Sequence, residues 1–258
     1  MGILNLTPDS FYDGGRFRNS SSVMRQVDKM LEDGATFIDI GAYSSKPNAK
    51  HVSEDEEMRR ILSVVNLVVN SFPEIVISID TFRSSIAKQC IEAGAAIIND
   101  ISAGLLDNNM LSTIAKFKVP YIMMHMRGTP QTMQTLTDYN DLIKDILFYF
   151  SERITKAKSY GIIDIICDPG FGFAKTKAQN FELLNHLELF KSLDLPILSG
   201  ISRKSMIYNT LEFSANEALN GTTALNMVAL EKGTSILRVH DVKEAMECVT
   251  LYNALHNQ

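Results

Sequence analysis

The sequence has few cysteines, no excess of basic charge and no long apolar run, and each absence argues against a class of protein. Cys90, Cys167 and Cys248 are far apart and show no CxxC spacing, so neither a disulfide framework nor a zinc site is predicted. The net charge of −5 argues against a nucleic-acid-binding surface, which needs clustered lysine and arginine. No window approaches the roughly 18 to 20 apolar residues of a membrane span, and no basic-then-apolar signal opens the chain. We therefore expect a cytoplasmic protein that acts on small molecules.

What the chain does contain is a series of short apolar runs, separated by amphipathic stretches. Apolar residues recur at helical spacing in these stretches, for example over residues 53–70 and 215–232. Because the short runs are apolar throughout, we expect strands buried on both faces, as in a parallel sheet covered by helices. The eight predicted strands are residues 2–5, 37–41, 75–80, 96–100, 121–125, 162–168, 197–199 and 236–240.

Helix start and stop residues support the same alternation. Ser53 is followed three residues later by Glu56, which is the spacing of a capping box. A glycine stands between the end of a helical stretch and the next strand at four places: Gly34, Gly94, Gly161 and Gly233. Eight units of similar size, without a GxGxxG after the first strand, favour an α/β fold of the (βα)8 TIM-barrel type, a parallel eight-stranded closed sheet, over a doubly wound open sheet. One domain over residues 1–258 is predicted.

Polar residues stand at the carboxyl ends of the predicted strands, where barrels of this type build their active sites. Carboxylate and amide groups there suit a flat ligand that presents neighbouring N–H donors, since a carboxylate can accept two parallel hydrogen bonds. A cationic group of Arg203, Lys204, Arg238 and His240 suits an anion such as a phosphate. The strand-end residues are Asn5, Asp80, Asn99, Asp100, His125, Asp168, Ser199 and His240.

Each of these residues also has a purely structural interpretation. Asn5 and Asn99 would satisfy loop backbone groups, Asp168 would start a turn, and Asp80 would cap the following helix. His125 fits a structural role at a strand end as well as a place in the mouth of the barrel, so it is not included among the catalytic residues.

Nine motifs, taken in order, resemble the dihydropteroate synthase family over essentially the whole chain. They are MGILNLTPDSFYDGG, DIGAYSS, SIDT, IINDIS, MMHM, DPGFGFAKT, SGISRKS, NGTTALN and RVHDV. That family is a (βα)8 barrel that condenses 6-hydroxymethyl-7,8-dihydropterin pyrophosphate with p-aminobenzoate in folate biosynthesis, releasing pyrophosphate with the assistance of Mg²⁺. The resemblance implies the same transferase activity here, by an SN1-like substitution without a protein nucleophile, and the absence of a GxSxG motif agrees with it.

The resemblance also implies roles for individual residues. The pterin contacts would be Asp80, Asn99, Asp168 and Lys204. The pyrophosphate contacts would be Asn5, Arg238 and His240, with Asn5 also helping to hold Mg²⁺. The p-aminobenzoate contacts would be Phe11, Ser45, Pro47, Phe173 and Lys204. The catalytic residues would be Lys204, Arg238 and His240. A homodimer and inhibition by sulfonamides are further expectations from the family.

The sequence departs from the family pattern in two places. Residues 43–48 read YSSKPN where the common pattern is STRPG, so that Ser45, Lys46 and Asn48 replace threonine, arginine and glycine. Lysine cannot repeat the planar bidentate contact of arginine, and we expect weaker anchoring of this loop or weaker anion binding. The chain also begins inside the first motif, so we expect that a short leading segment of the family is missing.

Three other functions compete with the synthase. A pterin-dependent methyltransferase domain shares the pterin carboxylates, but it has no pyrophosphate to bind, and the SRK and RVHDV motifs argue against it. A sugar-phosphate isomerase or aldolase needs an acid/base glutamate or a Schiff-base lysine at a strand end, whereas Lys204 lies in a basic loop. A non-catalytic pterin-binding paralogue stays open because of Lys46.

Overall fold

The structure, a computed structural model, describes residues 1–6, 20–43 and 52–256, and strands and helices alternate along them. The strands are β1 (Gly2–Asn5), β2 (Phe37–Gly41), β3 (Val76–Asp80), β4 (Ile97–Asp100), β5 (Tyr121–Met124), β6 (Ile165–Asp168), β7 (Leu198–Ser199) and β8 (Ile236–Leu237). The helices are α1 (Ser20–Glu32), α2 (Glu54–Ser71), α3 (Ser84–Glu92), α4 (Met110–Phe117), α5 (Leu142–Ser159), α6 (Lys177–Asn185), α7 (Ser205–Leu211), α8 (Leu219–Glu231) and α9 (Val242–His256). Short 3₁₀ turns are η1 (Met133–Thr135), η2 (Leu187–Leu193) and η3 (Ala215–Glu217).

All eight predicted strands are confirmed, although two of them are three residues shorter at one end than predicted. The run at 162–168 becomes a strand only from Ile165, and the run at 236–240 ends as a strand at Leu237. The predicted helix over 215–232 is divided, because Ser214 and Glu217 form a capping box that closes the short turn η3 before α8 begins. Ser53 caps α2 as predicted, its side chain accepting the Glu56 amide hydrogen.

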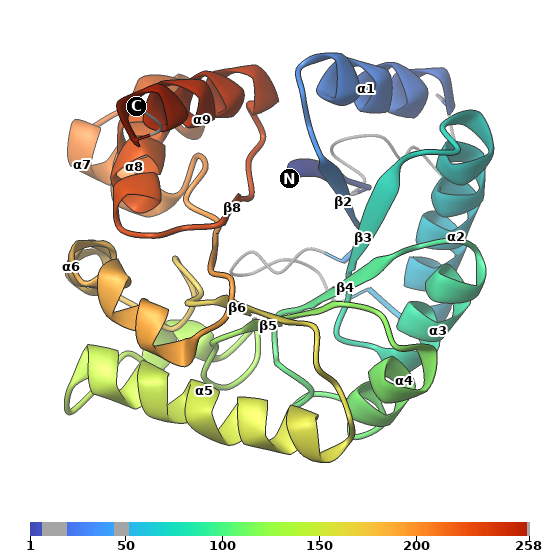
Figure 1. Cartoon of the computed structure of the whole chain (residues 1–258), viewed down its shortest axis with the longest axis horizontal. Coiled ribbons are helices and arrows are strands. Elements are labelled where there is room, and N and C mark those ends of the chain that lie inside the picture. The colour runs from blue at the N-terminus through green and yellow to red at the C-terminus, as the bar shows by residue number, and fades with distance from the viewer. Residues whose placement is uncertain (7–19, 44–51, 257–258) are drawn as a thin grey trace.

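The strands close into a ring. Strands β1 to β6 form one parallel sheet in chain order, and β7 and β8 form a second. Single parallel bridges join the two sheets, Cys167 to Ile197 at the β6–β7 seam and Gly2 to Val239 at the β8–β1 seam, and further backbone hydrogen bonds cross each seam. Helices surround this ring (Figure 1). The predicted barrel is therefore confirmed, and its two seams are its narrowest connections.

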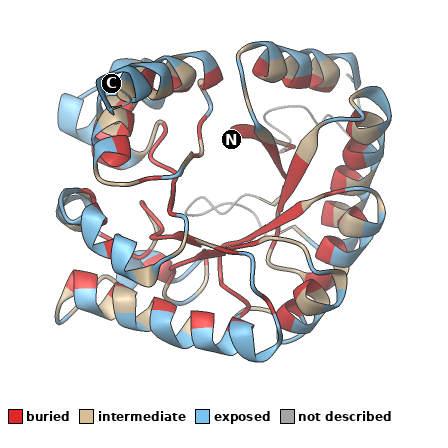
Figure 2. Cartoon of the chain, in the orientation of Figure 1, coloured by how far each residue is buried: buried red, intermediate tan, exposed pale blue. Residues whose placement is uncertain are grey.

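Side-chain alternation along the strands divides the core into two parts. Ile38 and Ile40 of β2, with Ile77 and Ile79 of β3, are fully buried in the large cluster that includes the helices. The alternate positions pack together inside the ring, and this inner cluster consists of Ile97, Ile122 and Leu198 with Met1, Phe37, Val76, Ala96, Ile166 and Ile236. Figure 2 shows the buried strands and the exposed outer faces of the helices. Within the described ranges, no helix is long and apolar enough to cross a membrane.

Glycine lets the loop after β6 approach a neighbouring strand. Gly170 has a φ of +74°, and a Cβ placed there would lie 2.1 Å from the carbonyl oxygen of His125. The Gly170 amide donates a hydrogen bond of 2.8 Å to Oδ1 of Asp168, so the loop turns tightly around the carboxylate that ends β6. A side chain at position 170 would displace the backbone that surrounds this carboxylate.

We predict that Gly170→Ala strongly destabilises the protein, because it adds a backbone clash to the cost of a left-handed conformation, which is about 1–2 kcal/mol. Gly161→Ala is the matched control, since Gly161 has a φ of +85° with nothing within 4 Å of the added Cβ. Urea unfolding should show a much larger loss for the first variant than for the second. Equal losses would show that the close contact with His125 is absent.

Candidate active site

Residues at the carboxyl ends of the first four strands lie in one row across the sheet. Asn5 pairs with Gly41, Gly41 with Asp80, and Asp80 with Asn99. Gly41 has no side chain, and a Cβ there would lie 3.3 Å from the Cβ of Asp80. The row therefore brings two amides and a carboxylate to one edge, as the sequence predicts, and leaves space between Asn5 and Asp80.

Arg238 connects this row to Asp39, a residue that the sequence analysis missed. Its Nε donates to Oδ2 of Asp39 at 2.6 Å, and its Nη2 donates to Oδ2 of Asp80 at 2.7 Å. The same Asp39 oxygen accepts a hydrogen bond of 3.0 Å from the amide of Asn99. Asp39 is fully buried, and its Oδ1 accepts no hydrogen bond within the described part of the chain. One guanidinium thus links β2 and β3 to the segment after β8.

The two carboxylates and the guanidinium perturb one another electrostatically. Burial alone would lower the pKa of Arg238, but Asp39 and Asp80 outweigh it and raise that pKa, so the guanidinium stays charged. Burial raises the pKa of Asp80 to about 7; the Arg238 charge opposes this rise and the Asp39 charge adds to it. Asp80 therefore titrates closer to neutral pH than an ordinary aspartate.

Asp168 and Lys204 form the second polar part of the mouth. The Nζ of Lys204 donates to the carbonyl oxygen of Phe171 and lies 4.8 Å from the centre of the Phe173 ring. Burial raises the pKa of Asp168, and the Lys204 charge acts against that rise. Burial lowers the pKa of Lys204 to about 8, with Asp168 acting against the fall and Arg238 adding to it. The Asp168 and Lys204 charges thus offset part of each other's cost of burial.

Lys175, which was also missed, fixes the loop that carries Phe173. It is only 5% exposed, and its Nζ lies 3.0 Å from the carbonyl oxygens of Gly170 and Phe173 and from Nδ1 of His125. Burial, with the nearby Lys175 charge, lowers the pKa of His125 far below its usual range, so the ring is neutral and Nδ1 can accept. Burial lowers the pKa of Lys175 well below its usual range, and the Asp168 charge acts against that fall. In the protonated form, the three N–H groups of Lys175 match these three acceptors. The sequence left two roles open for His125, a structural one and a place in the mouth of the barrel, and these contacts favour the structural one.

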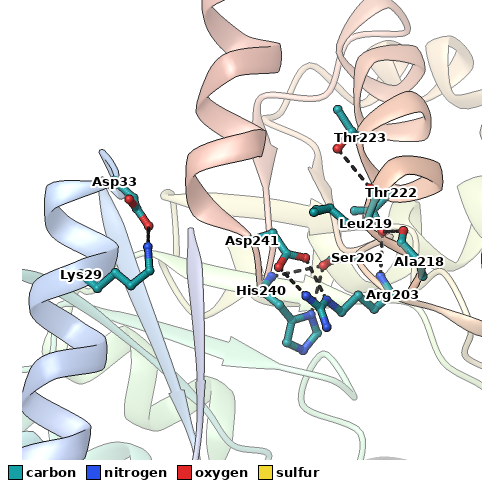
Figure 3. Close-up of polar contacts among 10 residues, drawn as sticks. All are labelled: Lys29, Asp33, Ser202, Arg203, Ala218, Leu219, Thr222, Thr223, His240 and Asp241. Carbon is teal, nitrogen blue, oxygen red and sulfur yellow. Dashed lines mark hydrogen bonds and ion pairs between the residues drawn. The ribbon is translucent and has the colours of Figure 1, made fainter. Parts of the chain in front are cut away.

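His240 and Arg203 lie where the segments after β7 and β8 meet (Figure 3). Ser202 Oγ lies 3.0 Å from Nδ1 of the exposed His240 ring. Arg203 forms a two-pronged ion pair with Asp241, at 2.9 Å from Nε and 2.6 Å from Nη2. The guanidinium of Arg203 therefore serves to join two loops, and the predicted cationic group is reduced to Lys204, Arg238 and His240.

Two of the predicted strand-end residues face the helices rather than the mouth. The Asp100 carboxylate is fully buried and accepts hydrogen bonds from the Tyr121 hydroxyl at 2.6 Å and from the Ser102 amide at 2.8 Å. The Ser199 hydroxyl is also fully buried, 2.8 Å from the hydroxyl of Thr234. Both predictions for the mouth were wrong because adjacent strand residues point to opposite faces.

The remaining predicted site residues either lie outside the described ranges or make no side-chain hydrogen bond within them. Phe11, Ser45, Lys46 and Pro47 lie outside the described residues. Asn5 is half-buried at the end of β1, and its amide makes no hydrogen bond to the part of the chain that the structure describes. In the same part of the chain, no group of three histidine, cysteine, aspartate or glutamate side chains is arranged to bind a metal ion.

Comparison with known proteins shows the family of the chain. Residues 1–240 match the model of a family described as pterin binding enzyme. The dihydropteroate synthase of Synechocystis is 43% identical, over 99% of this chain and 89% of that protein. A Yersinia pestis dihydropteroate synthase, solved as a sulfonamide drug complex, superposes with a TM-score of 0.93 at 39% identity, covering 100% of this chain and 94% of the other. The Xanthomonas albilineans synthase, solved with 4-aminobenzoic acid, gives 0.92 at 34% identity, with 100% and 92% covered.

The chain therefore belongs to the pterin-binding enzymes, and within them to the dihydropteroate synthase family. The activity of that family is a transferase reaction of folate biosynthesis.

We predict that Asp39→Ala lowers the free energy of unfolding by about 3 kcal/mol, because Arg238 loses its fully buried partner and keeps only the partly exposed Asp80. Asp33→Ala is the control: Asp33 pairs with Lys29 at the surface (Figure 3), and its loss should leave stability unchanged within error. Chemical denaturation measures both. A loss at position 39 no greater than at position 33 would contradict the structural role of the Arg238 network.

Proposed function

We propose that this chain joins p-aminobenzoate to the methylene carbon of 6-hydroxymethyl-7,8-dihydropterin pyrophosphate, forming 7,8-dihydropteroate and pyrophosphate. The observation that carries the proposal is the position of Arg238. It lies against Asp80, in the row of strand-end amides and carboxylate, and it follows β8, the strand paired with the one that Lys204 follows. A donor-rich ring and an anion can therefore bind next to each other, which is what a pterin pyrophosphate requires.

The pterin end of this site consists of Asp80, Asn99, Asp168 and Lys204. Asp168 uses Oδ1 for the Gly170 amide, and its other oxygen accepts no hydrogen bond from the described residues. A carboxylate held in this way can accept N–H groups from the edge of the pterin, while the amide of Asn99 supplies both donor and acceptor. Lys204 supplies a donor to the carbonyl side of the ring. Asp168 is in this scheme a binding carboxylate, and not a general base.

The p-aminobenzoate end is proposed to lie at Phe173 and Lys204. The Lys204 ammonium above the Phe173 ring gives an aromatic surface next to a positive charge, which suits an aromatic carboxylate. Phe11, Ser45 and Pro47 remain predicted contacts. Sulfonamides are proposed to compete at the same place, a proposal supported by the Yersinia pestis relative, which was solved as a sulfonamide drug complex.

The pyrophosphate end is proposed to consist of Arg238, His240 and Asn5. Mg²⁺ prefers oxygen ligands, and it commonly combines one or two protein oxygens with substrate phosphates and water. The Asn5 amide oxygen at the end of β1 fits such a role. When bound, Mg²⁺ would supply positive charge to the phosphate oxygens of the substrate.

The reaction follows from this arrangement. The bond between the pterin methylene carbon and the pyrophosphate oxygen breaks, and its electron pair leaves with the oxygen. The charged Arg238, with His240, stabilises the negative charge that develops there. The amine nitrogen of p-aminobenzoate then bonds to the carbon and loses a proton. Burial raises the pKa of Cys90 and of Cys167 to about 12, so neither thiol is a competent nucleophile at neutral pH.

We further propose one pterin-binding domain over residues 1–258, a cytoplasmic location and a homodimer. The three cysteines are free and buried, as is usual in a reducing compartment. The dimer is supported by exposed apolar side chains on and near the last three helices, which lie together in Figure 1. These side chains are Leu211, Phe213, Val228, Leu251 and Leu255.

The first experiment is an assay of pyrophosphate release from the pterin pyrophosphate, with and without p-aminobenzoate and Mg²⁺. We predict release coupled to dihydropteroate formation, and a loss of at least a hundredfold in kcat/KM for Arg238→Ala, since a charge that stabilises the transition state is removed. Arg59→Ala, which removes a surface arginine paired with Glu56, should keep full activity.

Near-normal rates for Arg238→Ala would contradict the proposal. Pterin binding by calorimetry without any turnover of the wild-type chain would favour the two alternatives, a methyltransferase domain or a non-catalytic paralogue.

We also predict that kcat/KM for p-aminobenzoate falls as the pH rises through about 8, because Lys204 loses its proton there. Below that pKa the lysine is charged, and above it the positive charge is lost. In Lys204→Arg the guanidinium stays charged, so the normalised profile should extend to higher pH. Identical alkaline limbs in the two proteins would exclude Lys204 as the titrating group.

A further inference from the structure

We propose that Ser202 is a positioning residue that orients the His240 ring and keeps the ring hydrogen on Nε2. This inference rests on the proposed function for its importance, because His240 is placed there at the pyrophosphate end. Ser202 is 4% exposed, and its hydroxyl oxygen accepts the backbone N–H of His240 at 3.2 Å while lying 3.0 Å from Nδ1 of the same residue. One hydroxyl thus contacts both the backbone and the ring of His240 (Figure 3).

The hydrogen-bonding capacity of a hydroxyl decides the direction of the second contact. A serine hydroxyl has one hydrogen and two lone pairs, and the His240 amide uses one lone pair. Among the described residues, Nδ1 of His240 is the other polar atom at hydrogen-bond distance from the Ser202 hydroxyl, and it can take the hydroxyl hydrogen only if it carries none itself. The opposite arrangement, with hydrogen on Nδ1, would leave the buried hydroxyl hydrogen unpaired, which is unfavourable. In the neutral ring, Nδ1 therefore accepts and Nε2 carries the hydrogen.

The backbone around this contact is fixed by a second link between the same two loops. Arg203 has a φ of +54°, unusual for a residue with a side chain, and its guanidinium binds Asp241 through two nitrogens. The Arg203 amide also donates to Thr222 Oγ1 at 3.1 Å. Successive residues, Ser202 with His240 and Arg203 with Asp241, thus tie the segment after β7 to the segment after β8. The ring of His240 cannot turn over without breaking the Ser202 contact.

This orientation matters for an anionic ligand. An Nε2–H group donates a hydrogen bond to a phosphate oxygen, whereas a bare Nε2 lone pair would face the negative charge. Ser202 consequently makes His240 a donor even when the imidazole is uncharged. The positive charge at this end of the site then comes from Arg238, and His240 contributes a directional hydrogen-bond donor.

The tautomer is tested directly by nitrogen-15 NMR of histidine-labelled protein, with the His240 signals assigned from His240→Asn. At a pH where the ring is neutral, we expect hydrogen on Nε2 in the wild type and in Ser202→Thr, which keeps the hydroxyl. Ser202→Ala should give a mixture of the two tautomers. Hydrogen on Nδ1 in the wild type, or an unchanged tautomer in Ser202→Ala, would overturn the proposal. This readout needs no activity, so it stays decisive even if the proposed function fails.

The consequence for binding is tested by steady-state kinetics. Ser202→Ala should raise KM for the pterin pyrophosphate about two- to fivefold, because the ring loses its fixed orientation and part of its donor tautomer, and leave KM for p-aminobenzoate unchanged. Ser202→Thr should restore the wild-type value. Ser199→Ala is the matched control, because it removes a buried hydroxyl contact with Thr234 on the helix side of β7. Equal effects of Ser199→Ala and Ser202→Ala would show a merely structural role and overturn the proposal.

Discussion

The whole site depends on one guanidinium that is shared by two carboxylates, the fully buried Asp39 and the partly buried Asp80. Arg238 comes from the segment after β8, whereas Asp39 and Asp80 belong to β2 and β3. The Arg238 charge would be unfavourable in this position without a partner, and the Asp39 and Asp80 carboxylates would repel each other without the guanidinium between them. Each of the three groups therefore needs the other two. Asn99 adds a hydrogen bond to Asp39 and extends the network to β4. The position of the strand-end acceptors and the position of the cation beside them are therefore set by the same contacts.

The loop after β6, which borders the same site, is held by a different set of contacts, those of Lys175. Lys175 is buried with no carboxylate of the described residues at hydrogen-bond distance, and its Nζ contacts two backbone carbonyls and the neutral ring of His125. Gly170 permits the approach that this requires. Asp168 and Phe173 are thereby presented on either side of a rigid turn, and Lys204 reaches the carbonyl of Phe171 within it. The backbone and the aromatic ring of this loop thus support the Lys204 side chain.

Sequence patterns predict the barrel and much of the mouth, because apolar runs and the polar residues that end them depend on local order alone. Asp80, Asn99, Asp168, Lys204 and Arg238 lie together as expected. Asp39 was missed because it lies inside a strand, although its alternation with Phe37 and Gly41 was a usable signal. Asp100 and Ser199 were wrongly placed in the mouth because the same alternation turns their side chains toward the helices. The contact of Ser202 with His240 joins residues 38 positions apart, and no periodicity within one element encodes it.

The two seams of the ring separate the charges of the site. The acidic residues Asp39, Asp80 and Asp168 belong to the six-stranded sheet, whereas Lys204, Arg238 and His240 follow the strands of the two-stranded one. Neither arc by itself contains a complete pocket, and opposite charges attract across the joints between them. A ligand that contacts both the acidic and the basic residues consequently bridges the two sheets. Ligand binding and closure of the barrel therefore stabilise each other. A chain whose last arc has not yet docked would present these three carboxylates without Lys204, Arg238 and His240, and would bind an anionic ligand poorly.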